Sequence, residues 1–415
     1  MPLARTAAAS FARLLALPAA AAAAKLKVPS DYPTLQSAIV AAAPGDVIKV
    51  AAGTYHERIV IPASKVGLRV QGSGAVTLDA TGTGSGAVVR VDAPAATVEK
   101  LTIAHAYGAS APSEGTGVHV TATATGAELR DLTIVRSERH GISVEAADVT
   151  VRSCRILGGE WGLLGHATAD DCRVFDCEVL FPVRFGVELD GPRGRIEKNV
   201  VRGQSGDGGA IRIEGADSIV AKNVIESCEQ GIQAPYSAAR AELRQNEIAA
   251  CRDLGVRVSG PDSRIESNEV SNCQGTGILL LSGTYLVVLK NDVRACRDGI
   301  SLYMGKHNLV KGNKVRLCLR DGFVAWHGSD HLLVDNRAEL NGVDGFDIES
   351  PRNELIENVA LSNLGEGIEN SGTETRLRKN EAFKNRIDVA MSQTPAAFEK
   401  NAYGTGGVDT APELD

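Results

Sequence analysis

The sequence predicts an all-β fold: a single-stranded, right-handed parallel β-helix, a solenoid of about 22–24 residues per coil with a short N-terminal capping helix. Three observations predict this fold. An Asn recurs at intervals of 22–24 residues between positions 199 and 380, a Gly followed by an apolar residue recurs in the intervals, and apolar residues alternate with polar ones within each unit. A fixed period in this range is typical of solenoids.

The Asn column marks one corner of each predicted coil. Asn tolerates the left-handed backbone conformation that a tight corner needs better than most other non-glycine residues do. We therefore expect these residues to adopt that conformation, and their side-chain amides to form hydrogen bonds with the equivalent Asn above and below. The column consists of Asn199, Asn223, Asn246, Asn268, Asn291, Asn313, Asn336, Asn358 and Asn380.

The segment after each Gly alternates between apolar and polar residues. Ile300 and Leu302 form one apolar pair, and Phe346 and Ile348 form another. A period of two is typical of strands and not of helices. We expect about three short strands per coil, and parallel pairing between neighbouring coils at a spacing of about 4.8 Å.

A second column lies five residues after the Asn column and changes from Cys to Asn along the chain. A disulfide needs Cβ atoms about 3.8 Å apart, whereas parallel side chains one coil apart are separated by about 4.8 Å. We predict free structural cysteines at an inward corner, and neither disulfides nor a metal site. The column consists of Cys228, Cys251, Cys273, Cys296, Cys318, Asn341, Asn363 and Asn385.

The chain divides into four predicted segments. Residues 1–24 resemble a signal peptide, with a basic start, an apolar stretch and small residues at its end. Because Arg13 lies late in that stretch, an uncleaved or transit-type leader is the alternative. Residues 25–46 contain the capping helix, which starts after Thr34 and stops at Pro44 and Gly45. Residues 47–400 form the β-helix, and residues 401–415 are a C-terminal tail.

Composition limits the partners. The chain has 44 Lys and Arg against 51 Asp and Glu, a formal net charge of −7. Nucleic-acid binding needs a basic face, so we expect no such partner. No apolar run after the leader is long enough to cross a bilayer. We expect a monomer that is secreted, or located in the periplasm or at the cell surface.

The Asn column over roughly residues 47–400 resembles the Asn ladder of the pectin-lyase-like superfamily and of NosD-like β-helix repeat proteins. Many chemistries share this scaffold, so the resemblance implies a fold and not a reaction. It also implies that the strand after each Gly lines an exposed groove. No catalytic motif of pectin methylesterases, polygalacturonases or alginate epimerases is complete in this sequence.

Outward and rim positions of that groove strand form a predicted central patch. The patch combines aromatic rings with charged groups, which suits a sugar, because one face of a sugar ring stacks on aromatic side chains and its hydroxyls form hydrogen bonds. The predicted substrate-binding residues are His140, Glu145, Trp161, Phe185 and Arg257.

The central patch also contains candidates for catalysis. Asp190 and Glu214 lie one coil apart, about 4.8 Å at the backbone, and Glu145 and Asp190 lie two coils apart, about 9.6 Å. These values bracket the carboxylate separations of retaining and inverting glycosidases. Arg212 and Arg257 could hold a uronate carboxylate. Solvated strand residues would give the same pattern. The predicted catalytic residues are Glu188, Asp190, Arg212, Glu214 and His166.

An acidic rim precedes the Gly in later coils. Carboxylates at coil spacing raise one another's pKa unless a cation lies between them, and oxygen ligands suit Ca²⁺. The alternative is a solvated rim with Asp-Gly turns. If the protein binds a metal cofactor, we predict Ca²⁺ at Asp298, Asp321, Asp344 and Asp347.

Two functions fit these observations. One is a secreted protein that binds, and cleaves or epimerises, an acidic, uronate-containing polysaccharide. The other is a NosD-like scaffold or binding protein without enzymatic activity. The first predicts a groove with Arg and carboxylates converging near Arg212, and the second predicts a flat outer face.

Overall fold

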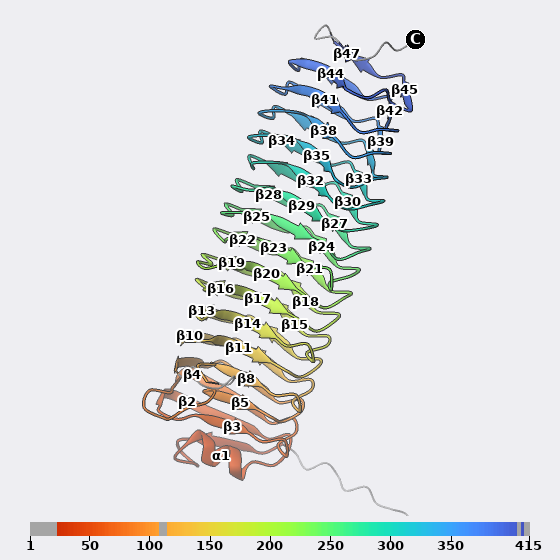
Figure 1. Ribbon diagram of the computed structural model, residues 1–415. Coiled ribbons are helices and arrows are strands. Elements are labelled where there is room, and N and C mark those ends of the chain that lie inside the picture. Colours follow the sequence, from red (N-terminus) through yellow and green to blue (C-terminus); the bar gives the residue numbers. More distant parts are fainter. Residues whose placement is uncertain (1–22, 108–113, 405–407, 411–415) are drawn as a thin grey trace, which may run out of the picture.

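The chain winds into a long stack of coils, with the helix at one end and the C-terminal strands at the other (Figure 1). The computed structural model describes residues 23–107, 114–404 and 408–410. Within these residues the strands form a 31-stranded sheet and a 16-stranded sheet, and neighbouring coils pair in parallel, as β18 (Arg195–Glu197) does with β21 (Ile219–Ala221). The predicted parallel β-helix is confirmed.

The 16-stranded sheet, called sheet B below, takes one strand from each coil, and each strand pairs with those of the coils before and after it. Its strands are β3 Ile59–Ile61, β5 Val89–Val91, β8 Val118–Val120, β11 His140–Val144, β14 Trp161–Gly165, β17 Phe185–Leu189, β20 Gly209–Ile213, β23 Ile232–Ala234, β26 Val256–Val258, β29 Ile278–Leu281, β32 Ile300–Tyr303, β35 Phe323–Trp326, β38 Phe346–Ile348, β41 Glu366–Asn370, β44 Ile387–Met391 and β47 Val408–Thr410.

The 31-stranded sheet, called sheet A, forms the other two sides of the coil. Its first column of strands is β1 Lys25–Val28, β2 Val47–Tyr55, β4 Arg69–Asp79, β6 Thr97–Glu99, β9 Glu128–Arg130, β12 Thr150–Arg152, β15 Arg173–Phe175, β18, β21, β24 Glu242–Arg244, β27 Arg264–Glu266, β30 Val287–Leu289, β33 Leu309–Lys311, β36 Leu332–Val334, β39 Glu354–Ile356, β42 Arg376–Arg378 and β45 Ala397–Glu399.

The second column of sheet A follows directly in each coil after a tight corner. Its strands are β7 Thr102–Ala106, β10 Thr133–Ser137, β13 Arg155–Leu157, β16 Glu178–Leu180, β19 Val200–Arg202, β22 Val224–Glu226, β25 Glu247–Ala249, β28 Glu269–Ser271, β31 Asp292–Arg294, β34 Lys314–Arg316, β37 Arg337–Glu339, β40 Val359–Leu361, β43 Glu381–Phe383 and β46 Ala402–Tyr403.

Inward side chains fill the interior in stacks that run along the solenoid. Phe323 and Phe346 are fully buried, and their rings stack with centroids 4.8 Å apart and an interplanar angle of 6°. That separation equals the spacing of neighbouring strands. Each inward residue therefore packs against its equivalent one coil away, which is why the period must be kept.

The helix α1 (Leu35–Ala41) covers the first coils, as predicted. Thr34 caps it by accepting a hydrogen bond from the backbone N–H of Ser37 at 3.1 Å, and Leu35 and Ile39 are fully buried. The helix is shorter than the predicted segment 25–46, because residues 25–28 form β1 and pair with β2. This extra strand lengthens sheet A by one coil beneath the helix.

The Asn column forms a ladder of buried hydrogen bonds. The Asn246 amide donates to Asn268 Oδ1 at 2.9 Å and to the Val220 carbonyl at 2.9 Å, and Asn268 Oδ1 also accepts the Asn246 backbone N–H. Asn246 and Asn268 are vertical neighbours, as predicted. The predicted backbone conformation was wrong: the left-handed residues are those just before the ladder, such as Gln245 and Ser267. The corner bends at an outer residue, while Asn turns inward to satisfy buried backbone groups.

The second column confirms the prediction of free cysteines. All eight cysteines are buried and unpaired in the described structure. Burial raises the pKa of the Cys172 thiol to about 12. Where Asn replaces Cys, a second ladder begins: Asn341 Oδ1 accepts the Cys318 N–H at 3.1 Å, and the Asn341 amide donates to Asn363 Oδ1 at 2.9 Å.

The coils continue past residue 400. Strand β46 pairs with β43, strand β47 pairs with β44, and Asn401 accepts the backbone N–H of Asn380 at 2.9 Å. The prediction of a tail from residue 401 was therefore wrong for these strands, because Asn401 continues the ladder. Residues 1–22 of the predicted signal peptide, and residues 405–407 and 411–415 of the predicted tail, lie outside the described residues.

Candidate functional site

The outer face of sheet B carries the predicted outward columns in register. Glu188 lies beside Arg212, and Arg257 lies beside Leu279. Further along, Ser301 pairs with Val324 and Val324 with Asp347. Counting from each Gly and the apolar residue after it therefore identifies the outward side chains of this sheet correctly in these coils.

The central patch contains a chain of polar contacts, called the Arg212 network (Trp161, Glu188, Arg212, Glu214 and Ser237). The Trp161 indole N–H donates to Glu188 Oε2 at 2.6 Å, and Arg212 Nε lies 3.6 Å from Glu188 Oε1. Arg212 also donates to Glu214, which in turn accepts the hydroxyl of Ser237. The network joins residues of four neighbouring coils, and its one cation is shared by two carboxylates.

Asp190 lies beside this network without a side-chain hydrogen bond to any described residue. Its Oδ1 atom is buried and unpartnered. Burial and the neighbouring Glu214 carboxylate raise the pKa of Asp190, and burial also raises the pKa of Glu188. The predicted catalytic carboxylates are thus brought together by the structure, and two of them have raised pKa values.

The two histidines of the patch, His140 and His166, lie on successive coils, and His119 lies on the coil before them. His140 is 4 % exposed, contacts Thr116 Oγ1 at 3.3 Å and packs against the Trp161 ring at 5.2 Å. Burial lowers the pKa of His140 to about 4, and burial also lowers the pKa of His166. His166 Nε2 lies 3.0 Å from Ser143 Oγ, and Glu145 Oε1 lies 3.0 Å from His119 Nε2.

The aromatic rings of the central patch do not offer open faces. Phe185 is 5 % exposed, and the Arg212 guanidinium lies 5.5 Å from its ring centre. The Arg184 guanidinium lies 4.8 Å over the Trp161 ring. The expected stacking of a sugar on these two rings therefore lacks a free surface. Arg257, by contrast, makes no ion pair with any described residue, so its charge is available on the surface of the sheet.

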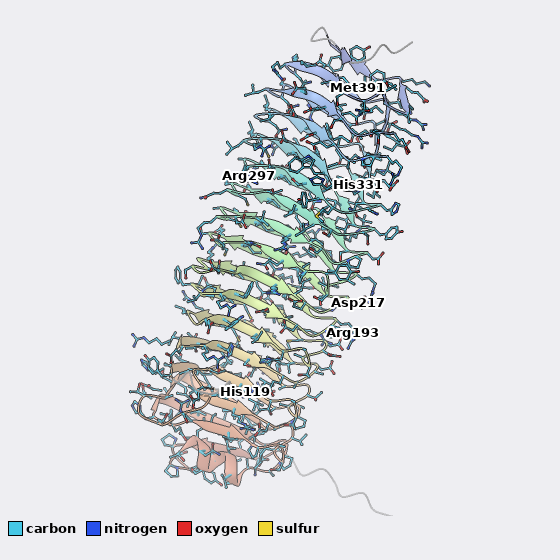
Figure 2. All side chains as sticks on the ribbon, in the orientation of Figure 1. His119, Arg193, Asp217, Arg297, His331 and Met391 are labelled. Atoms are coloured by element: carbon cyan, nitrogen blue, oxygen red, sulfur yellow. The ribbon has the colours of Figure 1, made fainter. Side chains whose placement is uncertain are left out.

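A cavity of about 350 Å³ lies further along the same face. It is called the aromatic groove below, and it opens between the strands of sheet B and the corner that carries Arg297, which Figure 2 labels at the edge of the stack. Trp326 is 40 % exposed, and its ring centre lies 6.4 Å from that of Tyr303. The lining residues are Leu254, Thr276, Leu279, Leu281, Arg297, Asp298, Ser301, Leu302, Tyr303, Arg320, Asp321, Val324, Trp326 and Asp347.

Sequence reasoning did not single out this groove. Leu281, Tyr303 and Trp326 occupy one outward position on three successive coils. Three large apolar or aromatic residues in line on an outward face are unusual for a solvated strand. This alignment was the sequence feature that could have predicted the groove. The depth of the groove also depends on the corner residues Arg297 and Arg320, whose positions the strand pattern does not predict.

The acidic rim is mostly a hydrogen-bonded structural column. Asp321 Oδ1 accepts the Asp344 N–H at 3.0 Å, and Asp344 Oδ1 accepts the Glu366 N–H at 2.6 Å. Asp298 lies 3.1 Å from Arg297 Nε and 3.8 Å from Arg320 Nε. Asp321 Oδ2 lies 3.7 Å from Arg320 Nη2. Arginine side chains are therefore the cations next to Asp298 and Asp321, where the sequence predicted Ca²⁺.

The four predicted metal ligands do not converge as a set. Among the described residues, the three carboxylates with atoms within 4.8 Å of one another are Asp344, Glu366 and Glu369. Burial and a hydrogen bond with Glu366 raise the pKa of Asp344, and Arg386 pairs with Glu366. Asp298, Asp321 and Asp347 line the aromatic groove, whereas Asp344 does not line it.

His331 belongs to a third ladder at the corner after the groove strand, on the edge of the stack opposite Arg297 (Figure 2). Its backbone N–H donates to Asn353 Oδ1 at 2.9 Å, and Asn308 N–H lies 3.4 Å from its Nδ1. Burial lowers its pKa to about 4, so it is neutral at pH 7. His331 therefore replaces an Asn in a ladder and does not reach the groove.

Several solved structures are similar to this chain. One is DFA-IIIase from Arthrobacter chlorophenolicus A6 in complex with GF2, at 15 % identity and a TM-score of 0.50, covering 78 % of this chain and 95 % of that chain. Another is a variant of the periplasmic alginate epimerase AlgG, at 13 % identity and a TM-score of 0.35, covering 93 % and 83 %. A third is the catalytic domain of a GH87 alpha-1,3-glucanase, at 10 % identity and 0.46, covering 94 % and 68 %.

At 15 % identity and a TM-score of 0.50, the similarity to DFA-IIIase shows a shared fold and nothing more. No curated protein sequence matches the chain. None of the described helices has the length and apolar character needed to span a bilayer. The family model described as "Right handed beta helix region" matches residues 161–315 and 255–402, together more than half of the 415 residues. The chain therefore belongs to this right-handed β-helix family.

Proposed function

We propose that this protein binds a polysaccharide along the outer face of sheet B, with sugar units held in the aromatic groove. The observation that carries the proposal is the exposed Trp326 ring beside the half-buried Tyr303 ring inside a cavity of about 350 Å³. The apolar face of a sugar ring stacks on such side chains, and the surrounding polar groups bind its hydroxyls. Leu279, Leu281 and Val324 add further apolar surface along the same strands.

Polar groups for sugar hydroxyls are close to these rings. Ser301 lies in the outward column between Leu279 and Val324. Arg297 and Arg320 line the groove but already face Asp298 and Asp321. Because both arginines are paired, no free cation remains among the residues that line the groove. We therefore expect the groove to bind an uncharged sugar unit.

An acidic unit of the glycan would bind one coil upstream, at Arg257. Arg257 pairs in register with Leu279, the first outward residue of the groove, and makes no ion pair with any described residue. An uncommitted guanidinium binds a carboxylate in a bidentate manner. This is the basis for proposing a uronate-containing polysaccharide, with Arg257 as the residue that distinguishes it from an uncharged chain.

A binding panel tests this proposal. The purified protein is titrated calorimetrically with uronate-containing and neutral polysaccharides, with and without Ca²⁺. We expect saturable binding of at least one glycan, stronger for an acidic chain at low salt. Absence of binding to the whole panel would refute the proposal.

A non-enzymatic scaffold is the second candidate function, and one observation favours it. In the Arg212 network every charged group has a partner, as expected of a structural surface. If the protein is a scaffold, substitutions in the groove should not change its affinity for glycans. Substitutions in the Arg212 network should then change only its stability. Secretion or a periplasmic location is a further part of our proposal, based on residues 1–24, and mass spectrometry of the mature N-terminus tests it.

A further inference from the structure

We propose that the aromatic groove also hydrolyses a glycosidic bond of the bound glycan, with Asp347 as the proton donor. This inference rests on the proposed function, since it needs a glycan in the groove. It places the chemistry between β32 and β38, several coils away from the predicted catalytic residues around Arg212.

Asp347 is the carboxyl group in the groove that no described residue engages. It occupies the outward position of β38, in register with Val324 on one side and Glu369 on the other. It lines the cavity together with Tyr303 and Trp326. Its side chain forms no hydrogen bond or ion pair within the described structure, whereas Asp298 and Asp321 both face arginines. A free carboxyl at the wall of a sugar-sized cavity is able to reach a substrate oxygen.

The surroundings of Asp347 keep its proton available near neutral pH. Burial is the main cause, and the carboxylates of Asp321, Glu349 and Glu369 add to it, while Arg320 opposes it; together they raise the pKa of Asp347 to about 7. A general acid works best when its pKa lies near the operating pH. Asp344 is less suited, because it accepts a backbone N–H and shares a hydrogen bond with Glu366.

A second carboxylate is needed to take up a proton from water, and Asp298 is the candidate. It lines the same cavity and lies 3.1 Å from Arg297 Nε and 3.8 Å from Arg320 Nε. Asp298 and Asp347 are two coils apart, about 10 Å along the stack, and Asp347 lies three residues further along its coil than Asp344, the register equivalent of Asp298. The two carboxyl groups are therefore further apart than the pair of a retaining glycosidase, which favours a mechanism with a water molecule between them.

The hydrolysis needs only the glycan and one water molecule. Asp347 gives its proton to the glycosidic oxygen, and the bond between that oxygen and the anomeric carbon breaks. Water attacks the anomeric carbon, forms the new C–O bond and passes its proton to Asp298. The products are two shorter chains, one with a new reducing end.

The test measures binding and new reducing ends for each glycan that the wild-type protein binds, across pH 4–9. We expect turnover that declines above about pH 7, as Asp347 loses its proton. Asp347→Asn should keep affinity within about 3-fold and lose at least about 100-fold in turnover, in line with the contribution of a general acid. Glu381→Gln, on the exposed face of sheet A, is the matched control and should retain wild-type turnover.

Each other outcome overturns the inference. If glycans bind but no reducing ends form, the proposed function stands and the hydrolysis is refuted. If Asp190→Asn abolishes turnover while Asp347→Asn retains it, the chemistry belongs to the central patch. Asp347→Glu adds a further check, because partial recovery with a shifted pH profile requires a proton donor, whereas a structural role would leave the pH profile unchanged.

Discussion

The central patch and the aromatic groove lie on the same face of sheet B and differ in how their polar groups are satisfied. In the central patch Arg212 contacts two carboxylates, and Trp161 donates to one of them under the Arg184 guanidinium. In the groove, Trp326 is 40 % exposed and Asp347 has no side-chain partner among the described residues. Charged and aromatic residues that contact one another along a solenoid column stabilise the fold. Those that line a cavity instead are available to bind a ligand.

The largest expected effect is the loss of the shared cation in the central patch. Arg212→Met leaves Glu188 and Glu214 without their counterion, and removing one partner of such a pair is costly. Since Arg212 is partly exposed, we expect a loss of about 2–3 kcal/mol in the free energy of unfolding, measured from urea denaturation. Arg257→Met should change it by less than about 0.5 kcal/mol. Equal effects of the two substitutions would mean that the network contributes nothing.

Titration should separate the two regions by opposite signs. The pKa of His140 is lowered to about 4 from about 6.5 in the unfolded chain, so its stabilising contribution is complete above pH 6.5 and is lost as pH falls towards 4. The pKa of Asp347 is raised to about 7, so its contribution is complete below about pH 4 and is lost as pH rises through 7.

Two variants measure these contributions. Between pH 7 and pH 4.5, wild type should lose about 2 kcal/mol more than His140→Gln. Between pH 5 and pH 9, wild type should lose about 2 kcal/mol more than Asp347→Asn. Urea midpoints at the four pH values give the result. A reversed sign for either variant would show that burial does not control that group.

Stacking on Trp326 in the aromatic groove should account for most of the affinity for the glycan. Trp326→Ala removes the exposed ring and should weaken glycan binding by about 30-fold, equivalent to about 2 kcal/mol. Phe181→Ala is the matched control, since Phe181 is 64 % exposed and lies at a corner of sheet A. Calorimetric titration of both variants checks this. An unchanged affinity in Trp326→Ala would exclude stacking in the groove.

The smallest effect concerns charge selection. Arg257→Gln should weaken the binding of an acidic glycan by about 10-fold and leave a neutral glycan within about 2-fold, as expected for one bidentate contact. The salt dependence of acidic-glycan binding should fall in the same variant. A uniform loss for both glycans would assign Arg257 a structural role.

The strand pattern predicted much of this molecule, for identifiable reasons. The period of two after each Gly assigns outward positions, because a strand alternates its side chains, so Glu188, Arg212 and Asp347 fell in the right columns. The period also placed Asn246 above Asn268. The conformation at that corner was wrong, because burial of the amide, rather than tolerance of a left-handed backbone, selects Asn there.

The remaining errors arise at corners and between coils. Arg184 covers Trp161 from a segment outside the strands, and Arg297 and Arg320 build the wall of the groove in the same way. Their side-chain directions depend on three-dimensional packing and not on a period. Arg297 and Arg320 likewise approach Asp298 and Asp321, two of the four residues predicted to bind Ca²⁺, and the strand pattern gave no sign of these contacts.

Fluorescence of the two tryptophans tests the central claim most directly, because the chain contains only Trp161 and Trp326. A Trp161→Phe variant reports on the groove alone, and a Trp326→Phe variant reports on the central patch alone. On titration with the bound glycan, we expect a saturable change in emission from the first variant and none from the second. A response confined to Trp161 would contradict the account and place the ligand at the central patch.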